Sequence, residues 1–403
     1  MKSLDSRKQL LYGLLIVGAG LAVPQILAYL ASIFAARILN PADFGAFGTI
    51  QGITQIGQPI GLGIQALIVS KLIKNSKKSY KNILKFGLEI SIFVFIANMV
   101  ISIPLSNIFK VDYLVLVLAI GAVSPFIFVS TQLGVAQGKE LYIKLALIYI
   151  SFGVGRSVTA IVGLLIYPNL ISVSIGFFVG TFLSAVISHF ILGNGGKFWK
   201  IKKLRNETLS LIKSTQALLA LYVLVNVDIL IARIVLSQEL SGVYAVGMLV
   251  AKIAFFMPQA ITVVLFPKMG KNQSSSLKYA ILGTISVGVA YIIICYFGSQ
   301  IIIQAIGGKQ YTNLYNEIWI FAVEGTLFAI LQVLLYGKIA KDNISVSILL
   351  WMGTFVTILL AWILNINSIS SIVNVLIFVT STLIMLTTFS ESVTKKRKMS
   401  FTK

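Results

Sequence analysis

Cysteine, histidine and acidic residues are scarce in this chain of 403 residues, and each shortage excludes a class of protein. The one cysteine, Cys295, cannot form a disulfide within the chain, and it cannot build a thiol-rich metal site alone. With a single histidine, His189, the chain also has no histidine cluster. The 12 acidic residues stand against 33 lysines and arginines, which gives a formal charge of +21. We therefore expect no metal site.

Several sequence motifs of nucleotide-binding proteins and enzymes are missing too. The chain contains no GxxxxGK[ST], so it does not bind ATP through that phosphate-binding loop. It also contains neither GxSxG nor Asp-x-Asp. Without a constellation of catalytic residues, we expect a protein that is not an enzyme and that needs no cofactor.

Hydrophobic residues, by contrast, are abundant: they make up 57% of the chain, whereas charged residues make up 11%. They gather in twelve apolar stretches, each of which reaches the ~20 residues that a helix needs to cross a bilayer. The sequence therefore predicts an all-α polytopic membrane protein with twelve transmembrane helices. The stretches are 10–36, 44–70, 83–106, 113–137, 141–166, 169–192, 209–236, 242–267, 277–303, 314–336, 344–365 and 367–390.

The basic residues fall almost entirely in alternate gaps between these stretches. One set of gaps, with the two termini, holds 27 of the 33 lysines and arginines, and the opposite set holds only four. Because loops rich in lysine and arginine stay in the cytoplasm, we expect both termini there. A nucleic-acid partner is not expected, since the charge is spread over many short loops rather than gathered on one face. Attraction to anionic membrane lipids is sufficient to explain it.

The two halves of the chain resemble each other. Residues 36–39 (ARIL) and 232–235 (ARIV) each precede a short polar turn and then a helix interrupted by a proline. A Gly-rich and then basic segment, 193–208, lies between the halves, so we predict six-helix bundles at 1–196 and 197–403. Six spans is an even number, so the repeats are parallel, and transporters of this design carry their substrate in a central cavity between the bundles.

The repeated blocks carry a family resemblance. Residues 31–72 (ASIFAARILNPADFGAFGTIQGITQIGQPIGLGIQALIVSKL) and 226–269 resemble the matching parts of bacterial Wzx-type polysaccharide flippases. These belong to the multidrug/oligosaccharidyl-lipid/polysaccharide exporter superfamily. The resemblance implies a prokaryotic plasma-membrane protein that translocates a polyprenyl-diphosphate-linked oligosaccharide for surface polysaccharide synthesis. Implied partners are this lipid, the membrane lipids, a coupling H⁺ or Na⁺, and membrane proteins of polysaccharide synthesis.

Charged residues inside the predicted spans are the first candidates for a site, because they are costly there. Arg156 lies midway along the fifth span with Tyr149 on its face, and a guanidinium suits phosphate oxygens. Lys252 lies midway along the eighth span, on one face with Gln259. The alternative for Arg156 is an ion pair that locks helices together, and for Lys252 it is a side chain that reaches to the membrane surface.

The acidic residues Asp228 and Glu324 lie in the seventh and tenth spans. They either pair with these cations or carry a coupling ion. In the second span, Gln51, Gln55, Gln58 and Gln65 share one helix face. This stripe of glutamines either binds the hydroxyl groups of a substrate or forms hydrogen bonds between helices.

Other functions remain in competition with the flippase hypothesis. A multidrug exporter of the same superfamily would need a net acidic cavity for its cationic substrates. A peptidoglycan-precursor flippase usually has two further helices. A polysaccharide polymerase commonly has a sizeable external loop, which this chain lacks.

Overall fold

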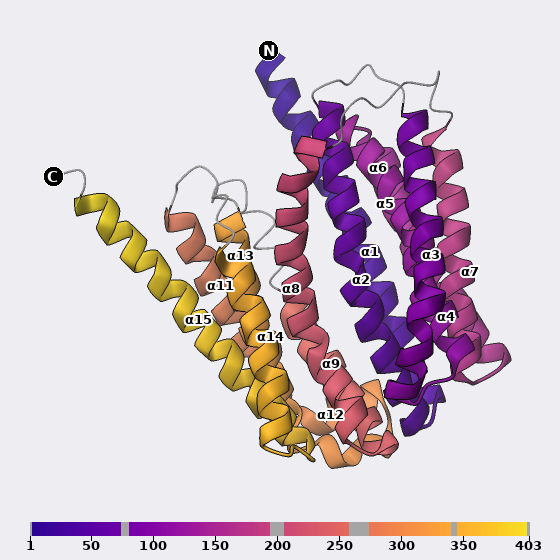
Figure 1. Cartoon of the computed structure of the whole chain (residues 1–403), viewed down its shortest axis with the longest axis vertical. Helices are drawn as coiled ribbons and strands as arrows, with labels where there is room; N and C mark the ends of the chain where they lie inside the picture. The colour runs from indigo at the N-terminus through magenta and orange to yellow at the C-terminus, as the bar shows by residue number, and fades with distance from the viewer. Residues whose placement is uncertain (1, 74–79, 194–204, 258–273, 340–344, 401–403) are drawn as a thin grey trace. The chain divides into compact units, whose positions relative to one another are not determined.

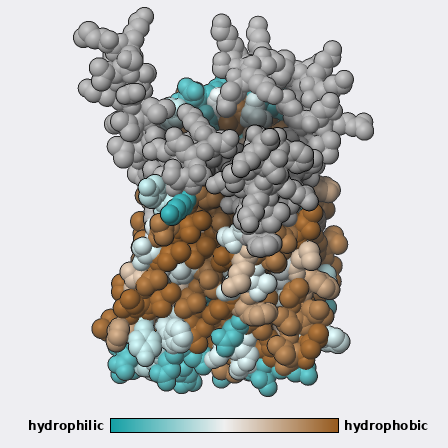
Figure 2. Space-filling view, turned by 90° about the vertical axis from the view of Figure 1, so that its left-hand side faces the viewer, coloured by the Kyte–Doolittle hydropathy of each residue, from teal (hydrophilic) through white to brown (hydrophobic). Residues whose placement is uncertain are grey.

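The computed structural model describes residues 2–73, 80–193, 205–257, 274–339 and 345–400. Within these ranges all regular secondary structure is helical, and eleven helices are long and apolar enough to cross a membrane. A shorter apolar helix, Ser347–Ile363, completes the predicted twelve. The prediction of a twelve-helix polytopic membrane protein is confirmed, and apolar side chains cover the middle of the face drawn in Figure 2.

The chain divides into two compact units, Met1–Thr215 and Gln216–Lys403. The predicted division between residues 196 and 197 stays a prediction, because residues 194–204 lie outside the described ranges. In the first unit, α6 packs on α7 and α1, and α5 packs on α2 and α3 (Figure 1). The helices of this unit are α1 (Lys2–Ile38), α2 (Pro41–Ile73), α3 (Lys81–Phe109), α4 (Tyr113–Gly121), α5 (Val123–Gly138), α6 (Tyr142–Ile166) and α7 (Leu170–Leu192).

The long helix α8 (Arg205–Val235) spans the boundary between the units. In the second unit, α13 packs on α9, α11 and α15, and α14 packs on α15. The helices of this unit are α9 (Gln238–Phe256), α11 (Ser274–Phe297), α12 (Ser299–Ile306), the 3₁₀ helix η1 (Lys309–Leu314), α13 (Ile318–Ile339), α14 (Ser345–Ile363) and α15 (Ile369–Ser400).

Two of the predicted spans are not single helices. The span at 113–137 is broken into α4 and α5 at Ala122. Pro125 lies in the first turn of α5 and has no N–H to donate back to the end of α4, which explains the break. The span at 277–303 ends at Phe297, and the rest of it forms the separate helix α12.

The turns that carry the ARIL and ARIV repeats are capped in the same way. In the first unit, Asn40 Oδ1 accepts a hydrogen bond of 2.9 Å from the N–H of Asp43. In the second, Ser237 Oγ accepts one of 3.2 Å from the N–H of Leu240. Each cap satisfies an N–H at the start of a helix that has no partner within that helix. Both repeats therefore turn the chain sharply from one membrane helix into the next.

A close approach of two helices holds the site helix α6 in place. Pro24 of α1 lies against Gly153 of α6, and a Cβ at position 153 would lie 2.5 Å from the Cα of Pro24. Only glycine fits at this crossing, which lies one turn from Arg156.

Tyr80 closes the end of the first unit that carries Lys139 and Lys144. Its hydroxyl donates to the carbonyl oxygens of Leu192 at 3.3 Å and Gly193 at 3.2 Å, at the end of α7. The ammonium of Lys139 lies 4.6 Å from the centre of its ring. Burial raises the pKa of Tyr80, so the hydroxyl keeps its proton at neutral pH.

Two substitutions of Tyr80 should therefore destabilise the protein to different extents. We expect Tyr80→Phe to lower the free energy of unfolding by about 1 kcal/mol, because it removes the hydrogen bonds and keeps the ring. Tyr80→Leu should cost about 0.5–1 kcal/mol more, because the cation–π contact is lost as well. Denaturation in detergent measures both. The control is Tyr113→Phe, which removes an exposed hydrogen bond to Met99, and an equal loss there would contradict the prediction.

Candidate functional site

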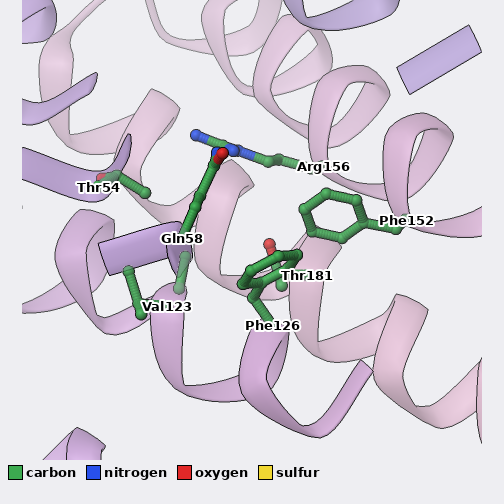
Figure 3. Close-up of a pocket in the computed structure, with 8 residues that line it drawn as sticks. Thr54, Gln58, Val123, Phe126, Phe152, Arg156 and Thr181 are labelled. Atoms are coloured by element: carbon green, nitrogen blue, oxygen red, sulfur yellow. The ribbon is translucent and has the colours of Figure 1, made fainter. Parts of the chain in front are cut away.

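A pocket lies inside the first unit between α2, α5, α6 and α7. The space between its side chains amounts to about 230 Å³ when the open solvent at its mouth is included. Figure 3 shows Gln58 and Arg156 on one side of it and two phenylalanines on another. The lining residues are Thr54 and Gln58 from α2, Ala122, Val123 and Phe126 from the start of α5, Phe152 and Arg156 from α6, and Thr181 from α7.

Arg156 is the cation of this pocket. Its guanidinium carbon lies 4.7 Å from the centre of the Phe177 ring on α7, a cation–π arrangement. In Figure 3 the side chain of Gln58 points toward the guanidinium. Within the described part of the chain, no carboxylate forms an ion pair with Arg156. The alternative in which Arg156 locks helices through a described acid therefore has no support, and its N–H groups are available to an anionic ligand.

Two half-buried aromatic rings form the apolar part of the lining. The ring centres of Phe126 and Phe152 are 5.0 Å apart. Phe152 lies one helical turn from Arg156 on α6, whereas neither Phe126 nor Thr181 was predicted. Phe126 directly follows Pro125 in the first turn of α5, and nothing in the sequence singles out Thr181.

The glutamine stripe of α2 is divided between different partners. Gln51 donates to Ser32 Oγ at 3.2 Å, which is a contact between helices. Gln55 and Gln58 are half-buried, and only Gln58 lines the pocket. Gln65 donates to Gln137 Oε1 at 2.8 Å and to the Tyr149 hydroxyl at 3.0 Å. Tyr149 thus belongs to a polar cluster with Gln65 and Gln137, and Gln137 was not predicted there.

The face of α6 that carries Arg156 has different neighbours along its length. Thr159 donates to the carbonyl oxygens of Gly155 and Gly176, both at 2.6 Å, so it joins α6 to α7. Gly163 also faces α7, where a Cβ would meet the backbone of Ser172. The part of the face from Arg156 toward Tyr149 borders the pocket and the polar cluster, and the part toward Gly163 is a packing surface.

A second group of ionisable residues lies inside the second unit, on α8, α9 and α13. The Tyr244 hydroxyl donates to Asp228 Oδ2 at 2.9 Å, and both side chains are fully buried. Asp228 is close enough to Lys252 to attract it and close enough to Glu324 to repel it. Glu324 is fully buried, and neither of its carboxylate oxygens has a hydrogen-bond partner among the described residues.

Of the predicted site residues, Gln259 lies outside the described ranges. The two predicted cations lie in different units: Arg156 in the first and Lys252 in the second. No group of three or more histidine, cysteine, aspartate or glutamate residues that could hold a metal ion occurs in the described part of the chain.

Comparison with known proteins gives one family match. The sequence model of a family described as "Polysaccharide biosynthesis protein" matches residues 34–316, which is more than half of the chain. The match contains the pocket with Arg156 and also Asp228, Tyr244 and Lys252. No curated protein matches the sequence.

Solved structures share the fold over nearly the whole chain. An inward-facing multidrug resistance MATE family transporter of the MOP superfamily has a TM-score of 0.69 at 13% identity, covering 94% of this chain and 99% of that one. The lipid II flippase MurJ has 0.69 at 16%, covering 94% and 87%. A MOP superfamily transporter from Pyrococcus furiosus, whose binding pocket is described as having reversed polarity, has 0.61 at 11%, covering 98% and 96%. Identities this low establish a shared fold.

Proposed function

Since the chain belongs to the family of polysaccharide biosynthesis proteins and has the fold of MOP superfamily transporters, we propose that it is a lipid-linked oligosaccharide flippase. Its cargo is a polyprenyl-diphosphate-linked repeat unit for surface polysaccharide synthesis. It works in the plasma membrane of a prokaryote, with both termini in the cytoplasm, where the lysine-rich loops are retained. Membrane proteins that make and polymerise the repeat unit are its expected neighbours.

The observation that carries this proposal is an arginine inside the membrane that no described carboxylate neutralises. A polyprenyl-diphosphate sugar cannot cross the bilayer unaided, because desolvating its charged and hydroxylated headgroup is very costly. The guanidinium of Arg156 would hold a phosphate through paired hydrogen bonds. Gln58 lies beside it and would bind a further oxygen of the headgroup through its amide. The lipid tail stays in the bilayer throughout.

The acidic group in the second unit would supply ion coupling. Glu324 has two buried acceptor oxygens that a proton or a sodium ion would satisfy. Asp228, which interacts with Glu324, links this site to Lys252. Binding of the ion changes the charge balance around Lys252 and so its affinity for an anionic cargo. Lys252 is thus a cargo contact whose strength depends on Asp228.

A multidrug exporter is the second candidate, and the same acidic pair favours it. Two buried carboxylates, of which Glu324 has no described hydrogen-bond partner, would attract an organic cation as well as a small ion. In the pocket of the first unit, however, Arg156 would repel such a substrate. The two candidates therefore differ in which unit's charged residue binds the transported molecule.

Deleting the protein from its cell tests the function directly. We expect a diphosphate-linked oligosaccharide to accumulate on the cytoplasmic side, and surface polysaccharide to fall in proportion, because the headgroup has no other path. Lipid extraction with mass spectrometry measures the accumulation and identifies the glycan. Re-expression of the chain should reverse it. Changed drug sensitivity without accumulation would instead support the exporter, and accumulation of lipid II would indicate a peptidoglycan-precursor flippase.

A further inference from the structure

Two polar layers cross the first unit at equal spacing on two antiparallel helices. Gln58 and Arg156 form one layer at the pocket, and Gln65 and Tyr149 form the other. The layers lie seven positions apart on α2 and also on α6. At a rise of 1.5 Å per residue this is about 10 Å. Phe152 lies between Tyr149 and Arg156 along α6, and the ring of Phe126 packs on it.

The second layer has hydrogen-bonding capacity that the described protein leaves open. Gln65 is 8% exposed, yet its Oε1 has no hydrogen-bond partner. The Tyr149 hydroxyl accepts from Gln65, and among the described residues no acceptor takes its proton. Gln137 accepts through Oε1, and its side chain is exposed. The cluster therefore offers one acceptor and several donors within reach of each other.

This combination is complementary to a ring of hydroxyl groups, each of which both donates and accepts. We propose that Gln65, Gln137 and Tyr149 form a subsite for the first sugar of the cargo, while Arg156 holds the phosphate next to it. This assignment rests on the proposed flippase function. The separation of about 10 Å suits a diphosphate that reaches from one layer to a sugar ring at the other. The rings of Phe126 and Phe152 provide an apolar surface for the path between them.

The subsite also selects the charge of that sugar. All three of its side chains are neutral, and the nearest lysines are engaged elsewhere. Lys139 lies over the ring of Tyr80, and Lys144 donates to the carbonyl oxygen of Leu192 at 3.1 Å. A sugar carboxylate placed against Gln65 would lose its hydration without gaining a cation. The first sugar is therefore an uncharged hexose or hexosamine and not a uronic acid.

The competing explanation is that the cluster only holds α2, α5 and α6 together. Under it, removal of a hydrogen bond would loosen the whole pocket and weaken every ligand alike. The two explanations thus differ in selectivity: a sugar subsite affects only ligands that carry a sugar. Gln132, which donates to the carbonyl oxygen of Ala185 at 3.1 Å, provides the structural comparison, because it also joins helices of this unit.

The test uses the full-length protein in lipid nanodiscs and three ligands. These are a polyprenyl diphosphate, the same lipid carrying one neutral hexose, and the same lipid carrying one uronic acid. We expect the hexose to improve the dissociation constant about tenfold and the uronic acid to give no improvement. Tyr149→Phe and Gln65→Ala should abolish the tenfold gain and leave binding of the bare lipid unchanged. Arg156→Ala should weaken all three ligands equally, and Gln132→Leu should leave the gain intact.

Each other result would overturn the subsite. If Tyr149→Phe and Gln65→Ala weaken the bare lipid as much as the glycosylated one, the cluster is only structural. If the hexose adds no affinity, or the uronic acid adds as much as the hexose, the assignment of a neutral sugar is wrong. If the wild-type protein binds none of the three lipids, the proposed function itself fails, which is a distinct outcome.

Discussion

Arg156→Ala protein should insert and fold normally and yet export almost no polysaccharide. Truncating one partner of a buried, hydrogen-bonded charge pair costs about 2–5 kcal/mol, so binding of the diphosphate should fall at least about 30-fold. Removing the guanidinium should not harm folding, because it takes an unpaired charge out of the membrane interior. Arg156→Lys should keep part of the activity, since an ammonium retains the charge and loses the paired hydrogen bonds.

The measurement is surface polysaccharide per inserted protein molecule, together with binding of a polyprenyl diphosphate. Lys85→Ala is the matched control. Lys85 also carries a positive charge in the first unit, but it forms an exposed ion pair with Glu89 at 3.9 Å, and such pairs contribute little. Normal export by a correctly inserted Arg156→Ala protein would remove Arg156 from the mechanism, and lost export by Lys85→Ala would show that general charge matters instead.

Glu324→Leu should make the protein more stable and at the same time end its dependence on a coupling ion. Glu324 buries two carboxylate oxygens without described partners, and each unsatisfied buried group costs about 1–3 kcal/mol. Leucine of similar volume removes this cost and also the repulsion from Asp228. Asp228→Leu should instead lower the free energy of unfolding by about 1–3 kcal/mol, because it leaves the buried Tyr244 hydroxyl without its acceptor.

Thermal unfolding in detergent gives the two stability changes, and transport into vesicles at different pH and sodium concentrations gives the coupling. A Glu324→Leu protein that is less stable than wild type would mean that the carboxylate has a structural partner. A Glu324→Leu protein that is stable and still responds to both ions would exclude Glu324 from coupling.

The sequence was sufficient for the number of membrane helices because hydrophobic length is a property of single segments. It could not locate the break at Ala122 or the end of α11 at Phe297. At both positions a helix stops within an apolar stretch of the chain. Hydropathy does not change at these positions, so it cannot locate the helix ends. Pro125 lies just beyond the break at Ala122, but a proline inside a span is compatible with a kink and with a break equally.

The site was predictable only in part, for the same kind of reason. In the structure Phe152, one helical turn from Arg156, and Gln58 line the same pocket as Arg156. Spacing could not show that Thr159 turns to the backbone of α7, because that depends on how closely α6 and α7 pack. Nor could spacing identify Gln137 on α5, which accepts a hydrogen bond from Gln65 on α2 although the two residues are 72 positions apart in the sequence.

The single positive charge of Arg156, which lies against the ring of Phe177, determines how the membrane potential acts on transport. A polyprenyl-diphosphate headgroup carries about two negative charges, and Arg156 offsets one of them, while Lys252 already has the attraction of Asp228. The occupied first-unit pocket would then keep an excess negative charge. In a cell whose interior is negative, each such charge gains about 2.3 kcal/mol per 100 mV on moving outward. The voltage of the energised membrane would thus favour export by electrophoresis, even before any ion gradient contributes.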